Sequence, residues 1–319
     1  MEYLPFKLLL PILTFVSVAL VASQAADDVS PDAYWKSVLP NAPMPKVVKD
    51  ILHNEWIEGK STSVGEGKAS YSTSLSWNQE ATETEVHDTR KVGVFFFEKD
   101  LKRGTKKKLY FTKTTNAETT FLPRQVADKI PFSSEKMAEI LDQFSVKPYS
   151  KEAEVMKKTV KLCEKPRMKG EEKYCATSLE SMVDFSISKL GKSIQPISTE
   201  VEKKTNKLQE YRVLGVKKLG GEKSVQCHKL NYAYAVFYCH KLTATKAYVV
   251  SLVGVDGTKA NAVVACHADT SAWNPKSLAL QVLKVKPGTV PICHFFPEDN
   301  VVWVQNLISP GKRISVPVI

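Results

Sequence analysis

The chain has 319 residues, long enough to bury a sizeable core in one or two domains. Its formal net charge is +11, which favours acidic partners: nucleic acid, an anionic membrane or an acidic polysaccharide. The sequence contains no GxSxG nucleophile elbow, no HExxH helix and no phosphate-binding loop, so the hydrolase, zinc-protease and nucleotide-binding classes that use those motifs are excluded.

The N-terminus has the pattern of a secretory signal peptide. Lys7 precedes an apolar run over residues 8–22, and Ser23-Gln24-Ala25 fits a small-x-small cleavage site. The run is short for a membrane span and no basic cluster follows it. We therefore expect residues 1–25 to be cleaved on secretion, which leaves a mature chain with neither a membrane nor a nucleic-acid partner.

Two segments separate this leader from the main domain. Residues 26–58 are punctuated by prolines, and residues 46–52 within them are predicted to form a short helix. This segment is either a docking or sorting element or a simple N-terminal arm. Residues 59–92 are rich in Ser, Thr and Glu and are predicted to be a disordered linker, with an exposed His87. The main domain is expected over residues 93–319.

The first half of this domain combines two strands with helices. Residues 94–97 and 108–112 are predicted strands, joined by a turn over residues 102–105. Three helices follow, each with a start signal or helical apolar spacing: residues 134–143, 150–162 and 177–190. Ser150 caps the second helix and Gly191 ends the third.

From Ile194 onward the pattern changes to short β-like runs separated by turns. The candidate strands are residues 211–216, 225–228, 232–240, 247–255, 262–267, 289–296 and 301–304. Asp256-Gly257 is a good two-residue hairpin turn between two of them. The sequence therefore predicts an α+β fold with a mainly antiparallel β core in its C-terminal part and about three helices before it.

Four adjacent Cys-His pairs dominate the last third of the chain. They are Cys227-His228, Cys239-His240, Cys266-His267 and Cys293-His294. Successive side chains of a strand point to opposite faces, so each pair on a strand sends its sulfur one way and its imidazole the other. If all four pairs behave in this way, the sulfurs can crosslink the core and the imidazoles can meet elsewhere.

The residues around these pairs fit that alternation. Over residues 232–240, the face shared with Cys239 is small and apolar, whereas the face ending in His240 carries tyrosines. Those tyrosines are Tyr232, Tyr234 and Tyr238. Near Cys266, Ala262 and Val264 share the sulfur side, whereas Val263 and Ala265 share the side of His267.

Six cysteines in a secreted chain predict a framework of three disulfides. Cys163 and Cys175 lie outside the Cys-His pairs and flank one loop, so we expect them to bond to each other. The remaining two bridges join the other four cysteines in an order that the sequence leaves open: Cys227, Cys239, Cys266 and Cys293.

The four histidines are candidate metal ligands: His228, His240, His267 and His294. Neutral imidazole binds copper, zinc and nickel, and disulfide formation would exclude zinc–thiolate chemistry. Four converging imidazoles without free thiolate suit copper. The tyrosines of residues 232–238 are expected to line the site next to them. The alternative is that the imidazoles are structural and hydrogen-bonded inside a disulfide-stapled module.

This arrangement resembles the BURP family of plant secreted proteins, whose signature is four Cys-His dipeptides at this spacing. Further stretches resemble family motifs: residues 95–101, 121–124, 130–134, 170–182 and 273–275. The resemblance covers roughly residues 93–319 and is closest to the dehydration-responsive and seed-protein branches. It implies a stress- or seed-associated protein of the apoplast and cell wall, or alternatively of the vacuole. In that setting the positive charge favours an acidic wall polysaccharide such as pectin as partner.

The resemblance also implies a second function. Some BURP proteins are copper-dependent peptide cyclases, which crosslink a Tyr or Trp side chain within a short core peptide, often on the same chain. By resemblance, the four histidines would be the copper ligands. This sequence departs from that pattern, because residues 70–77 end in Trp77 but lack a Gln-led start, and Ser277 and Asn300 stand where many relatives carry histidine. We therefore carry three hypotheses forward: a secreted protein that binds metal, a peptide cyclase, and a disulfide-crosslinked module whose histidines are structural.

Overall fold

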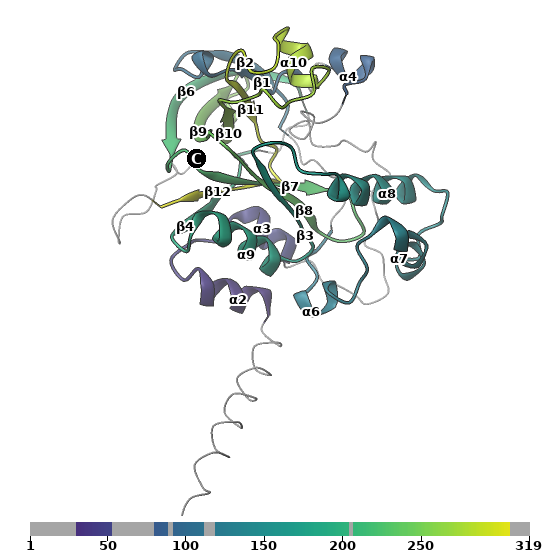
Figure 1. Ribbon diagram of the computed structural model, residues 1–319. Helices are drawn as coiled ribbons and strands as arrows, with labels where there is room; N and C mark the ends of the chain where they lie inside the picture. The colour runs from purple at the N-terminus through teal and green to yellow at the C-terminus, as the bar shows by residue number, and fades with distance from the viewer. Residues whose placement is uncertain (1–29, 53–79, 89–91, 112–118, 204–206, 307–319) are drawn as a thin grey trace, which may run out of the picture.

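The computed structural model describes residues 30–52, 80–88, 92–111, 119–203 and 207–306 (Figure 1). The predicted signal peptide and the candidate core peptide at residues 70–77 both lie outside these ranges. Within the described ranges, no helix has the length and apolar character needed to cross a bilayer.

Two antiparallel sheets form the centre of the fold. The larger one has seven strands in the order β1-β11-β10-β9-β6-β2, with β5 paired to β10. Its strands are β1 (Phe95–Phe97), β2 (Lys106–Leu109), β5 (Glu200–Val201), β6 (Gln209–Leu219), β9 (Thr245–Gly254), β10 (Lys259–His267) and β11 (Ile292–Phe295). The smaller one has five strands in the order β3-β8-β7-β12-β4. Its strands are β3 (Glu171–Ala176), β4 (Ile194–Ile197), β7 (Ser224–Leu230), β8 (Val236–Leu242) and β12 (Val301–Gln305).

The helices lie around these sheets and confirm the predicted α+β class. The α-helices are α2 (Pro31–Val38), α3 (Lys46–Leu52), α4 (Glu83–His87), α6 (Arg124–Ala127), α7 (Met137–Gln143), α8 (Lys151–Glu164), α9 (Leu179–Leu190) and α10 (Leu278–Leu283). The three predicted helices correspond to α7, α8 and α9. The Ser150 hydroxyl accepts from the Ala153 N–H at the start of α8, and Gly191 ends α9 with a φ of +84°.

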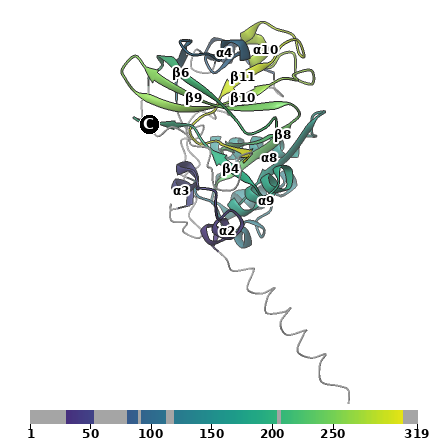
Figure 2. The same cartoon turned by 90° about the vertical axis from the view of Figure 1, so that its left-hand side faces the viewer.

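The layers follow from which face of each strand is apolar. Figure 2 shows the seven-stranded sheet above the five-stranded sheet, with α9, α2 and α3 below the latter. Val263 and Ala265 of β10 pack in one cluster with Val302 and Val304 of β12, so this cluster lies between the sheets. Ala262, Val264 and Cys266 belong to a different cluster, on the opposite face of β10, as the alternation predicts.

Four local predictions need correction. The strands β1 and β2 do not form a hairpin, because β1 pairs with β11 and β2 pairs with β6. The loop expected between the cysteines at 163 and 175 contains β3, which pairs with β8. The strand expected over residues 232–240 begins only at Val236, after bends. The C-terminal part of the expected linker forms α4, whose end at His87 is exposed as expected.

Three of these corrections depend on contacts with distant parts of the chain. The residues of β1 and β3 become strands because they find partners far along the chain. Helix α4 is started by a capping box between Thr82 and Glu85, and the Ala81 N–H donates to the carbonyl of Lys276. The hydrogen bond to Lys276 attaches this segment to the main domain, although its composition alone favours disorder.

The Pro-punctuated N-terminal segment is a docked element in the part that the structure describes. Residues 46–52 form α3 as predicted, and α2 precedes it. The ring of Trp35 lies 5.5 Å from that of Trp303, and its Nε1–H donates to the carbonyl of Ala42 at 3.0 Å. These buried contacts show that α2 packs against β12 of the main domain.

Candidate metal centre

The strand register settles the disulfide order that the sequence left open. Cys227 on β7 stands directly opposite Cys239 on β8, and the two are bonded. In the other sheet, Cys266 on β10 stands opposite Cys293 on β11, and these are also bonded. The third bridge joins Cys163 at the end of α8 to Cys175 on β3, as predicted.

Sulfurs and imidazoles leave the strands on opposite faces, as the alternation predicts. The Cys227–Cys239 bridge lies in the cluster that packs under α2, α3 and α9. The Cys266–Cys293 bridge lies in the cluster on the outer side of the seven-stranded sheet, with Phe96 and Phe295. The imidazoles therefore point to the space between the two sheets.

Within each sheet the two histidines form a diagonal pair. His240 stands opposite Gln226 and His228 opposite Tyr238, so these two imidazoles meet diagonally across the strands. Their Nε2 atoms are 3.3 Å apart. The same geometry in the other sheet brings the Nε2 atoms of His267 and His294 to 3.2 Å.

The two pairs meet across the interface between the sheets. The ring centroids of His228 and His294 are 6.4 Å apart. The ring of Phe296 contacts both, at 5.3 Å from His228 and 4.7 Å from His294. The structure thus gathers the four histidines that the sequence singled out into one contiguous cluster.

Burial keeps imidazoles of this cluster neutral. Each of the four residues is at most 1% exposed. Burial lowers the pKa of His228 and of His267 well below the usual range, and the neighbouring imidazoles lower it further. Burial also lowers the pKa of His294 to about 4, although the Phe295 carbonyl opposes the shift. Neutral imidazole is the form that binds a metal ion.

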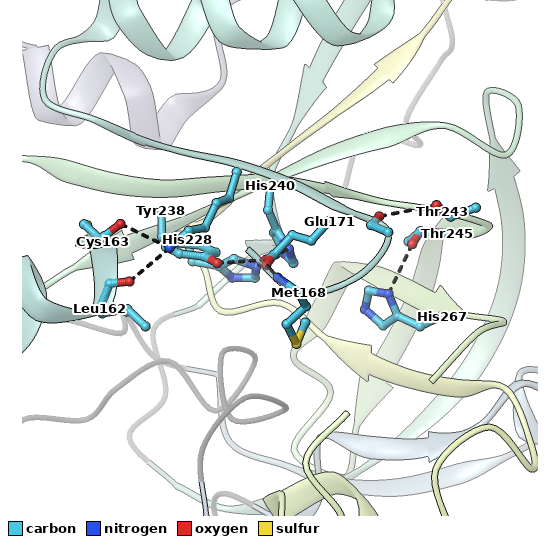
Figure 3. A network of polar contacts seen from close by, with 12 residues as sticks. Leu162, Cys163, Met168, Glu171, His228, Tyr238, His240, Thr243, Thr245 and His267 are labelled. Carbon is cyan, nitrogen blue, oxygen red and sulfur yellow. Dashed lines mark hydrogen bonds and ion pairs between the residues drawn. The ribbon is translucent and has the colours of Figure 1, made fainter. Parts of the chain in front are cut away.

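Glu171 is the residue of this centre that the sequence did not reveal. Its Oε1 accepts from the Tyr238 hydroxyl at 2.8 Å and faces His240 Nδ1 at 3.2 Å, and its Oε2 accepts from the Met168 N–H at 3.1 Å (Figure 3). Burial opposes ionisation of Glu171, but the hydrogen bonds that it accepts, led by that from His240, lower its pKa overall. A carboxylate on Nδ1 orients a histidine so that Nε2 faces the metal position. The sequence did not predict this role, because a glutamate in a polar segment is normally expected to be exposed.

The other three histidines also have a polar partner at Nδ1. His267 Nδ1 lies 3.1 Å from the Thr245 hydroxyl, and His294 Nδ1 lies 3.5 Å from the Phe295 carbonyl oxygen. His228 Nδ1 lies 3.1 Å from Nδ2 of Asn300, one of the two departures noted in the sequence. Ser277, the other departure, is buried at the start of α10, and its hydroxyl has no hydrogen-bond partner among the described residues.

Of the three tyrosines expected to lie beside the histidines, only Tyr238 does so. The ring of Tyr238 lies 5.5 Å from that of His240. Tyr232 and Tyr234 instead pack on the side of Phe132 and Phe144, at ring distances of 5.2 and 5.7 Å. They precede β8 in bends, so strand alternation does not govern their direction.

The four imidazoles are chemically suited to bind copper, and the Nε2 separation within each pair also suits a shared ion. Two ligand nitrogens bonded to one ion at about 2.0–2.1 Å in a tetrahedral arrangement stand about 3.3 Å apart. The Nε2 separations of 3.3 and 3.2 Å within the two pairs match that spacing. Among the described residues, however, no group of three or more His, Cys, Asp or Glu side chains is arranged to hold an ion as it stands. The two pairs would have to move towards each other to share one.

Comparison with known proteins agrees with the Cys-His pattern. The BURP domain family profile matches residues 94–305. The chain is 55% identical to BURP domain protein RD22 of Arabidopsis thaliana over 232 residues, which make up 71% of this chain and 59% of that protein. It is 55% identical to BURP domain-containing protein 3 of Oryza sativa subsp. japonica over 235 residues, which make up 72% of this chain and 54% of that protein.

The chain thus spans between half and two thirds of the length of these two relatives. A third relative, BURP domain-containing protein 5 of Oryza sativa subsp. japonica, is 44% identical over 285 residues, which cover 86% of this chain and 87% of that protein. The profile and this relative each cover most of the chain, and the profile includes all four Cys-His pairs. The chain belongs to the BURP domain family.

Proposed function

We propose that this chain is a secreted BURP domain protein that binds copper between its two sheets. Its place of action is the apoplast and cell wall, or alternatively the vacuole, in stress or seed development. One observation carries the metal proposal: four buried imidazoles gather with Nε2 atoms 3.2–3.3 Å apart within each pair, while every described cysteine is in a disulfide. A bound copper ion would add a coordination bond between the sheets and supply one-electron chemistry there.

The disulfides support secretion. Bridges form and persist in oxidising compartments, and the cytosol keeps thiols reduced. All six cysteines of the chain are paired in the structure. The signal-peptide pattern of residues 1–25 points to the same compartment.

Surface charge supports an acidic polysaccharide as partner. The adjacent strands β2 and β6 carry exposed basic side chains: Lys106, Lys108, Arg212, Lys217 and Lys218. The net charge of +11 adds a long-range attraction for a polyanion. Pectin is the acidic polymer that a plant cell wall offers, so we propose it as the partner of this surface.

The cyclase function is less well supported than metal binding. A cyclase must bring a Tyr or Trp side chain of the core peptide to the metal, and catalytic metal sites keep one position open. The four histidines are at most 1% exposed, so a peptide could reach them only if the sheets opened. Burial of this degree favours a closed site that holds the ion.

Equilibrium dialysis of the full chain against copper(II) tests the proposal. We expect about one tightly held copper ion per chain, lost when His294→Gln removes one imidazole. His87→Gln, which changes an exposed histidine on α4, is the matched control and should bind like the original chain. Equal copper binding by all three proteins would show that the ion is held elsewhere.

A further inference from the structure

Four residues form a row across four adjacent strands of the seven-stranded sheet. Lys106 on β2 stands directly opposite Arg212 on β6. Arg212 stands opposite Val253 on β9, which in turn stands opposite Lys259 on β10. Directly opposed residues of paired strands point to the same face, so the four side chains share one face of the sheet. Because adjacent strands are about 4.8 Å apart, the row spans about 14 Å.

The row lies beyond the interface between the two sheets. Val249 of β9 and Val263 of β10 pair with each other and pack in the cluster shared with β12. Val253 and Lys259 are also paired with each other, four residues further along the same strands. They therefore share the face of that cluster but lie about 13 Å away from it along the strands. The three cations of the row are exposed there, and Val253 is half-buried.

The protein neutralises the charge of the row only in part. Lys106 Nζ lies 2.9 Å from Oε1 of Glu210. Glu202 accepts from the backbone N–H of Lys259 at 3.4 Å, at the other end of the row. Among the described residues, Arg212 has no ion-pair partner. Its guanidinium is therefore available to an anionic ligand from outside the molecule.

Apolar side chains lie beside Arg212 on the same face. Leu214, at the bulge of β6, follows it by two residues and is 40% exposed, whereas Val213 between them is buried on the opposite face. Val253 is the neighbour of Arg212 on β9. A sugar ring has apolar C–H faces, and both apolar side chains can contact such a face. The row thus combines positive charge with apolar contacts, which suits an acidic sugar better than an inorganic polyanion.

We propose that this row binds an acidic polysaccharide whose sugars carry free carboxylates, with the polymer running across the strands. This inference rests on the proposed pectin partner and deepens it, because it names the residues and the form of pectin that they bind. Arg212 binds a uronate carboxylate through two parallel hydrogen bonds, and Lys106 and Lys259 bind carboxylates on either side. The Lys106 ammonium has three N–H donors, so it can keep its contact with Glu210. Methyl esterification removes the carboxylate charge, so the row selects de-esterified pectin.

Titration calorimetry of the full chain with polygalacturonate measures the contribution of the row. Arg212→Gln should weaken binding roughly fivefold or more at low ionic strength, because a bidentate contact between charged groups is lost. Arg167→Gln is the matched control, because it removes the same charge from an exposed arginine in the loop between α8 and β3. The control should weaken binding by less than roughly twofold, since it changes only the net charge. Highly methyl-esterified pectin should bind the original chain at least roughly tenfold more weakly than polygalacturonate does.

The outcomes separate this inference from the proposed function. If the original chain does not bind polygalacturonate at low ionic strength, the pectin partner and the row both fail. If it binds, but Arg212→Gln and Arg167→Gln lose the same affinity, the attraction comes from the net charge; the row is then not the site, while the pectin partner stands. Equal affinity for esterified and de-esterified polymer would overturn the selection of free carboxylates.

Discussion

Replacing Glu171 by Gln should destabilise the protein far more than the same change at the next residue. Glu171 is buried on β3 and accepts three hydrogen bonds, from the Tyr238 hydroxyl, His240 Nδ1–H and the Met168 N–H. Its neighbour Glu172 points the other way, towards solvent, where its side chain is 40% exposed.

The expected size follows from counting acceptors. The carboxylate uses Oε1 for two donors and Oε2 for the third, whereas a Gln side chain has one oxygen and an NH₂ group. In either orientation the NH₂ faces at least one buried donor, which costs about 1–3 kcal/mol. Loss of the charge weakens the remaining hydrogen bonds by about 1 kcal/mol. Glu171→Gln should therefore lower the free energy of unfolding by about 2–4 kcal/mol.

Urea unfolding of the metal-free protein with its disulfides intact measures this difference. Glu172→Gln is the matched control, because it removes ion pairs with Lys189 at 2.6 Å and Lys241 at 2.8 Å that are partly exposed. Such pairs contribute about 1 kcal/mol or less. If the two variants lose the same stability, the buried hydrogen-bond network does not support the centre as described.

Three further predictions concern the rest of the fold. Changing both Cys163 and Cys175 to Ser opens a bridge across 12 positions and should cost about 3 kcal/mol in urea unfolding; an unchanged midpoint would contradict this. Trp35→Ala should cost about 3–5 kcal/mol by the same assay, because the ring is buried against the sheet, whereas a loss below about 1 kcal/mol would mean that α2 is not docked. Burial opposes ionisation of Glu98, but hydrogen bonds led by that from Tyr248 lower its pKa, so its carboxylate stabilises the fold above the unfolded-state pKa of about 4.3. That stability should vanish as the pH falls through the lowered pKa, so Glu98→Gln should be less stable than the original chain at neutral pH and equally stable in strong acid; a constant difference would refute it.

Features that depend on neighbouring residues were predictable from the sequence. The cap at Ser150, the end of α9 at Gly191 and the position of the hairpin turn at Asp256-Gly257 each follow from a few adjacent residues. The turn itself is longer than the predicted two residues, because the loop between β9 and β10 spans residues 255–258. The opposite directions of Cys266 and His267 follow from strand alternation alone. These signals placed most strands and the three longest helices of the main domain.

Features that depend on strand pairing were not predictable. The bonding of Cys227 to Cys239 requires β7 to lie beside β8 in one register, and nothing in the local sequence states that register. The segment that forms β3 was predicted to be a loop because half of its residues are charged. It is a strand only because it pairs with β8.

The same limit applies to the candidate site. All four histidines could be named from their repeated position after cysteine, but their supporting partners could not. Glu171 is 69 residues from His240, and Asn300 is 72 residues from His228. Contacts between residues so far apart in the chain are created by the fold, so they appear only once the sheets are assembled.

Anomalous diffraction at the copper absorption edge, from crystals of the full chain grown with copper(II), tests the central claim most directly. The account predicts one strong peak between the two sheets, bonded to imidazole nitrogens of the buried histidine cluster, with all three disulfides intact. Copper bound only on the protein surface, with the space between the imidazoles empty, would contradict it.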